Sequence, residues 1–189
     1  MTANSPLSAE AGAAETFDAL GELPEWNLDD LYPGMDSAEL KRDLQAAEAR
    51  AAAFQLHYKG KLVDMAKGPD AGRKLAAAVR AFEDLEELLG RIISYAGLVH
   101  AGDTTDPKRA KFYGDVQEKI TAASSHLLFF GLELNRIDDR QMEAALADPE
   151  LGHYRPWIED VRAEKPYQLE DRVELLFHEK SVTARGSWN

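Results

Sequence analysis

Three long segments of this chain repeat apolar residues at alternating spacings of three and four, the pattern that gives a helix one continuous apolar face. The first stripe is Leu40, Leu44, Ala47, Ala51, Phe54 and Tyr58. The second is Leu75, Val79, Phe82, Leu85, Leu89, Ile92, Ala96 and Val99. The third is Tyr113, Val116, Ile120, Ala123, Leu127, Phe130 and Leu134. At about 1.5 Å per residue, such helices span roughly 35 to 45 Å each. We therefore predict an all-α fold, with long antiparallel helices in a bundle and almost no strand.

Local signals predict where these helices begin. Asp36 and Glu39 have the spacing of a capping box, so the first helix should begin at Asp36 or Ser37. It should end at Gly60, because glycine is the residue most often found just beyond a helix. The Gly-Pro-Asp sequence at 68–70 predicts the second start.

The third helix should begin at Asp106 and Pro107, an N-cap followed by a proline whose missing N–H costs nothing there. Only residues 101–105 connect the second helix to the third. We therefore expect these two helices to pack antiparallel as a helical hairpin.

The remaining segments predict a tail, a strap and several shorter helices. Residues 1–20 are rich in Ala, Ser and acidic residues and should be a disordered tail. Residues 21–135 should form the strap plus the hairpin and bundle, and 136–189 the shorter helices. The strap is an apolar cluster of Trp26, Leu28, Leu31 and Tyr32. The shorter helices are expected near 139–147, 152–163 and 170–178.

Charge and composition argue against several classes of partner. The chain has 34 acidic and 22 basic residues and a net charge of −12, which repels nucleic acid and anionic membranes. No apolar run approaches the roughly 20 residues that span a bilayer, and no secretory signal is visible. Cysteine is absent, which fits a reducing cytoplasm.

No histidine has the spacing of a zinc-peptidase helix. His178 and Glu179 are the only His-Glu pair, but H-E-x-x-H requires a second histidine where Val182 stands. We interpret His178 as a solvated residue at a helix end. The other histidines are interpreted as structural or exposed: His57, His100, His126 and His153.

Other candidate motifs also favour structural interpretations. Residues 97–104 imitate the spacing of a phosphate-binding loop but put Asp103 where lysine is needed. The acidic run 83–87 is interpreted as a solvated helix face. Four aromatic residues could line a peptide channel but more often fill cores: Phe129, Phe130, Trp157 and Tyr167. No catalytic, cofactor-binding or metal-binding residue is assigned.

Several segments, in order along the chain, are similar to oligoendopeptidase F proteins of the M3 zinc peptidase family. They are the sequence 23–32 (LPEWNLDDLY), 92–98 with 103–106, 127–134, Tyr154, 165–166 and 181–189 (SVTARGSWN). The resemblance implies a mostly helical, cytoplasmic zinc peptidase that encloses a channel and hydrolyses short peptides. In that family the two histidines of H-E-x-x-H and a later glutamate hold zinc, and none of these positions matches a residue here.

The resemblance and the missing motif lead to two hypotheses. In the first, the chain is the N-terminal, non-catalytic part of such a peptidase, a channel wall or lid that leads into an absent catalytic domain. It would be inactive alone, as a truncated or split gene product, and zinc would belong to the full-length relative. In the second, it is a free-standing acidic helical module that binds a protein or peptide.

Overall fold

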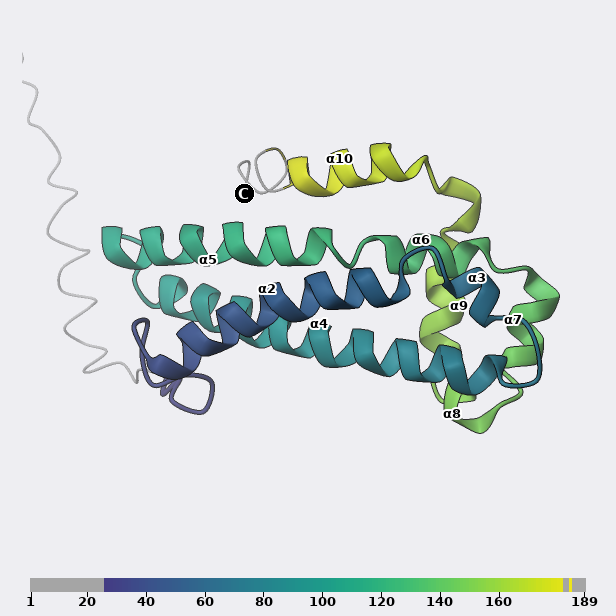
Figure 1. Ribbon diagram of the computed structural model, residues 1–189. Helices are drawn as coiled ribbons and strands as arrows, with labels where there is room; N and C mark the ends of the chain where they lie inside the picture. Colours follow the sequence, from purple (N-terminus) through teal and green to yellow (C-terminus); the bar gives the residue numbers. More distant parts are fainter. Residues whose placement is uncertain (1–25, 182–183, 185–189) are drawn as a thin grey trace, which may run out of the picture.

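The structure, a computed structural model, describes residues 26–181 and residue 184. The tail expected over 1–20 lies outside these residues, as does most of the segment 181–189. The described part is all-α and contains no strand, as the apolar stripes predict. In Figure 1 three long helices lie side by side, with short helices gathered at one end of them.

The helices differ widely in length. Three are long: α2 (Ala38–Tyr58), α4 (Ala71–Gly102) and α5 (Pro107–Ser125). The short ones are α3 (Leu62–Met65), α6 (Phe129–Arg136), α7 (Asp139–Ala145), α8 (Pro149–Gly152), α9 (Arg155–Ala163), the 3₁₀ helix η1 (Lys165–Tyr167) and α10 (Asp171–Ser181). The last of these, α10, lies along α5 (Figure 1).

The helix α2 begins at the second of the two predicted caps. The Ser37 hydroxyl accepts a hydrogen bond from the Leu40 amide at 3.3 Å, while the Asp36 side chain is fully exposed near Lys41. The predicted capping box on Asp36 is therefore wrong. The helix ends at Tyr58, and Gly60 follows with a φ of +80°, a conformation that glycine adopts without strain.

The predicted hairpin of α4 and α5 is confirmed (Figure 1). Two contacts show the antiparallel packing. Tyr95 faces Phe112 with ring centroids 6.1 Å apart, and Arg109, earlier in α5, donates to the carbonyl oxygen of Val99, later in α4, at 3.2 Å. Asp106 caps α5 as expected, accepting from the Lys108 amide at 2.8 Å. The 32 residues of α4 make it about 48 Å long.

The third long helix is shorter than predicted. The stripe predicts one helix through Leu134, but α5 ends at Ser125 and α6 begins at Phe129. Three hydroxyl side chains precede this break and donate to carbonyl oxygens three or four residues earlier: Thr121, Ser124 and Ser125. Such bonds bend helices, and the amides of 126 and 127 then turn to carbonyls three residues back.

The break places aromatic side chains in the core beneath the long helices. Phe130 is fully buried and stacks on Phe82 of α4 at 4.8 Å, and its ring lies 5.2 Å from Phe54 of α2. Trp157 of α9 packs against Phe82 at 5.7 Å. The core interpretation is therefore confirmed for these residues, but it is wrong for Tyr167, which is 76% exposed.

The expected short helices form with different boundaries. The helix predicted over 139–147 is α7, and the one over 170–178 is α10. The segment 152–163 instead divides into the end of α8 and all of α9, because Asp148 caps a separate turn that begins at Pro149. The single-turn helix α3 was not predicted.

The strap is anchored by its tyrosine and not by its tryptophan. Tyr32 is fully buried, and Leu28 and Leu31 pack partly buried against the core. Trp26 is 85% exposed, so its predicted place in the cluster is wrong.

Every helix among the described residues is too short or too polar to cross a bilayer.

Candidate functional site

The histidines are dispersed, and three of them lie in contacts between helices or in the protein interior while two are exposed. His178 lies 3.0 Å from the Ser124 hydroxyl, a contact that joins α10 to α5. His126 Nδ1 lies 2.9 Å from the Gln55 side-chain oxygen, and His57 and His153 are exposed. His100 Nδ1 is buried and has no hydrogen-bond partner in the structure.

The described residues do not fit a zinc site. Within residues 26–181 and 184, no group of three or more His, Cys, Asp or Glu is placed to hold a metal ion. A catalytic zinc requires about three protein ligands around one point. The Nε2 atom of His178 is in hydrogen-bond contact with the Ser124 hydroxyl instead.

The phosphate-loop-like segment and the acidic run are also structural. Asp103 accepts from the amide and the hydroxyl of Thr105, at 2.9 and 2.7 Å, and so caps the corner of the hairpin. In the acidic run Leu85 is buried while its acidic neighbours are exposed. One of these, Glu83, accepts from the Tyr154 hydroxyl at 2.7 Å.

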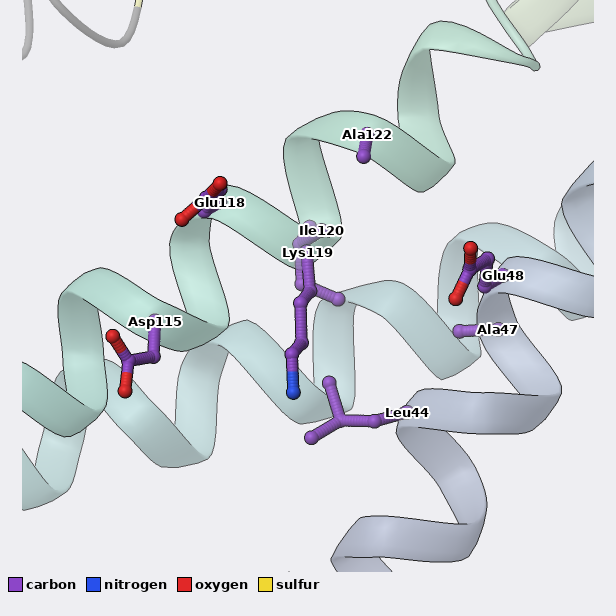
Figure 2. Close-up of a pocket in the computed structure, with 8 residues that line it drawn as sticks. All are labelled: Leu44, Ala47, Glu48, Asp115, Glu118, Lys119, Ile120 and Ala122. Atoms are coloured by element: carbon purple, nitrogen blue, oxygen red, sulfur yellow. The ribbon is translucent and has the colours of Figure 1, made fainter.

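A groove of about 320 Å³ lies between α2 and α5 (Figure 2). Leu44 and Ala47 form its apolar wall, and Lys119 extends across it toward Leu44. Three carboxylates from the two helices stand around it: Glu48, Asp115 and Glu118. Asp115 is already paired with Lys111. The lining residues include no histidine, serine or threonine, so the groove lacks the paired hydroxyl and imidazole of a serine-type hydrolase.

A buried polar network ties the strap to two long helices. The Tyr32 hydroxyl donates to Asp43 of α2 at 3.1 Å and accepts from Arg91 Nε of α4 at 3.1 Å. Arg91 also donates to Asp43, and its guanidinium lies 4.9 Å from the centre of the Tyr32 ring. Burial by itself raises the pKa of Asp43, but hydrogen bonds from Tyr32, Arg42 and Arg91 outweigh burial and hold this pKa below its ordinary value.

A second buried carboxylate orders the corner after α2. Glu133 of α6 is 5% exposed and accepts from the Gly60 amide at 2.6 Å and the Leu62 amide at 3.4 Å. These amides belong to the corner and to the first turn of α3, where backbone donors otherwise lack partners. Glu133 is thus a positioning residue that joins two parts of the chain 73 residues apart.

Arg162 of α9 caps the C-terminal end of α6. Its guanidinium donates to the carbonyl oxygens of Leu134 and Ile137, at 2.6 and 2.9 Å. Carbonyls at the end of a helix lack partners, and a cation satisfies both them and the helix dipole. Arg162 also pairs with Asp139 at the start of α7.

Three of these buried or capping residues were not predicted from the sequence: Asp43, Glu133 and Arg162. Two of them carry a signal in the sequence. Asp43 lies between Leu40 and Ala47 on the buried face of α2, and Glu133 stands in the apolar run 127–134. A carboxylate on an apolar face requires buried donors. No comparable signal marks Arg162.

Apolar side chains are exposed at the C-terminal end of the described chain. We call these residues the α10 surface: Tyr167, Leu169, Leu175, Leu176 and Phe177. A second cavity, of about 340 Å³, lies beside them between α6, α9, η1 and α10. Its walls are mainly apolar, and they include Tyr167 of the surface and the buried Asn135.

Comparisons with known proteins relate the chain to one peptidase family. Residues 133–189 match the family model described as Oligopeptidase F. Over 169 residues, or 87% of the chain, it is 28% identical to oligopeptidase PepF of Bacillus subtilis (strain 168). The chain spans 23% of the length of that relative. None of the solved structures matches.

The two matches agree with the resemblance read from the ordered segments. The family model begins at Glu133 within α6 and covers the short helices that follow, whereas the longer alignment also takes in the bundle. Together they support a similarity to the N-terminal region of oligoendopeptidase F-like proteins of the M3 family.

Proposed function

We propose that the chain is the N-terminal, non-catalytic helical part of a cytoplasmic zinc oligoendopeptidase that hydrolyses short peptides. Its helices form part of the wall or lid of the peptide channel, and 136–189 lead into the catalytic part. The observation that carries the proposal is the alignment to oligopeptidase PepF, which takes in 87% of the chain but only 23% of the relative.

The residues of this chain support a scaffold role in that protein. The sequence has no H-E-x-x-H, and the described residues do not fit a zinc site. Zinc and the bond-breaking groups are therefore assigned to the rest of the peptidase. A helical wall contributes by limiting the size of the substrate and by keeping water from the reaction.

The first experiment tests the chain alone. The purified 189-residue protein is incubated with zinc and a quenched fluorescent peptide of about ten residues. We expect no turnover above that of a boiled sample. Turnover that a chelator abolishes would show that the chain holds its own catalytic zinc and would contradict the proposal.

The second experiment tests the scaffold role. The matched segment of B. subtilis oligopeptidase PepF is replaced by this chain, and hydrolysis of the same peptide is compared with that of PepF lacking the segment. We expect the replacement to restore chelator-sensitive hydrolysis. A well-folded chimaera that is no more active than the shortened protein would argue against the role.

A second candidate function is a free-standing module that binds a protein or peptide. The exposed α10 surface favours it, because large exposed apolar patches mark interaction sites. The long apolar stripes do not favour it, because their side chains are packed inside the bundle. A monodisperse chain that melts cooperatively and binds a partner other than the peptidase would favour this function.

A further inference from the structure

The α10 surface has an uncommon distribution around its helix. Leu175, Leu176 and Phe177 are consecutive and are 36%, 53% and 63% exposed. Consecutive helical residues point about 100° apart, so these three side chains face different directions. A flat contact on one side of α10 cannot cover all three of them.

The helix α10 is held to the rest of the protein by polar contacts. None of its residues is fully buried. His178 reaches Ser124 of α5, and Asp171 pairs with Arg136 at the end of α6. Packing against the bundle therefore does not account for the apolar residues of α10.

The cavity beside α10 extends the same apolar region inward. Leu128, Leu132 and Val161 line it, and Tyr167 and Gln168 stand on the side from which the chain enters α10. A volume of about 340 Å³ holds one or two large side chains of a partner. Tyr167 belongs to both the surface and the cavity, so the two adjoin beside the helix.

The geometry limits what can cover this region. A short peptide, or α10 of a second copy, contacts one side of a helix and leaves the others in water. A second copy also brings its own net charge of −12 to the contact. A folded domain with a groove covers several sides of an inserted helix at once.

We propose that α10 inserts into an apolar groove on the zinc-bearing remainder of an oligopeptidase F-like protein. This inference rests on the proposed function and names the interface through which the scaffold is attached. The Oligopeptidase F match includes all of α10, and 77% of the PepF relative lies outside its alignment with this chain, enough to supply such a domain.

The experiment measures binding and not activity. The 189-residue chain is titrated with the remainder of B. subtilis PepF, and Kd is measured by sedimentation velocity, with circular dichroism confirming that both proteins are folded. The test variant is the double substitution Leu176→Lys and Phe177→Lys. The control is Leu56→Lys with Leu98→Lys, which makes the same change of charge at exposed leucines of α2 and α4.

We expect the test variant to bind at least about tenfold more weakly, because two large apolar side chains are no longer buried, and the control to bind like the unsubstituted chain. No binding by the unsubstituted chain, or equal weakening in both variants, would overturn the interface. So would dimerisation of the chain that the test variant abolishes, since the occupant would then be a second copy. If the chain binds but the PepF chimaera described above does not hydrolyse the peptide, the proposed function is contradicted and the interface stands.

Discussion

Glu133 accepts hydrogen bonds from two backbone amides at the corner after α2. Replacing it with leucine leaves the Gly60 and Leu62 amides without their acceptor, at a corner that is partly buried at Gly60 and buried at Leu62. We expect Glu133→Leu to lower the free energy of unfolding by about 1 to 3 kcal/mol, the usual cost of buried unpaired groups. Urea unfolding followed by circular dichroism measures the loss.

The control is Glu133→Gln, which keeps one acceptor oxygen and nearly the same shape. It should lose less stability than Glu133→Leu. Equal stability of the leucine variant and the original chain would mean that the corner is ordered without this carboxylate.

Asp43 provides a prediction about pH. Its pKa is lower in the folded chain than its ordinary value of 3.8, so the folded state favours the ionised form. The resulting stabilisation is complete well above pH 3.8 and is lost as the pH falls below 3.8 through the folded pKa. The difference in urea midpoint between the original chain and Asp43→Asn should therefore be largest near pH 6 and shrink toward pH 3. A difference that does not change with pH would assign the effect to packing.

At the scale of elements, α4 meets the α7–α8 turn without space for a methyl group. A Cβ atom on Gly72 would overlap the Asp148 side chain and lie 2.7 Å from the Ala145 carbonyl oxygen. We expect Gly72→Ala to destabilise the fold by about 1 to 3 kcal/mol, because the two elements must separate. Thermal unfolding measures this change.

Gly90 is the matched control in the same helix, because a Cβ atom there meets nothing within 4 Å. Gly90→Ala should raise stability by about 0.5 to 1 kcal/mol, the helical preference of alanine over glycine. If both substitutions stabilise the chain, the close approach at Gly72 is wrong.

The long helices show what periodicity in the sequence can predict. The three stripes predict the helices and the α4–α5 hairpin, because burying an apolar face dominates where long helices form. The break after Ser125 was not predicted, because the apolar spacing of the third stripe continues across it. The hydroxyls of Thr121 and Ser124 bond to backbone carbonyls there, which the apolar spacing does not reveal. Ser37 and not Asp36 caps α2. This choice depends on local backbone geometry, which the spacing of residues does not reveal.

The candidate site was less predictable than the fold. The interpretation of 97–104 as a corner between two helices is confirmed, since α4 ends at Gly102 and Asp103 accepts from the Thr105 amide. The α10 surface was not predicted, because a segment with apolar residues in several directions does not reveal which of them find partners. Trp26 and Tyr167 were placed in apolar packing for the same reason, and both are exposed.

At the scale of the whole molecule, charge provides the last prediction. A net charge of −12 makes the folded chain repel itself, and salt screens this repulsion over about 10 Å at 0.1 M. We expect the melting temperature to rise when sodium chloride is increased from 10 to about 200 mM. Most of the ion pairs are exposed, so their weakening should not reverse the trend. A melting temperature that falls with salt would mean that these pairs matter more than the net charge.

The bond from Glu133 to Gly60 also has a consequence for synthesis. The ribosome makes the chain from its N-terminus, so the turn after α2 leaves the ribosome 73 residues before its acceptor does. At about 5 to 20 residues per second, this delay lasts roughly 4 to 15 seconds. During that interval the nascent helices can form, but the path from α2 to α4 is not yet fixed. Glu133 is the first residue of the segment that matches the family model, so the turn after α2 gains its acceptor only when that segment emerges.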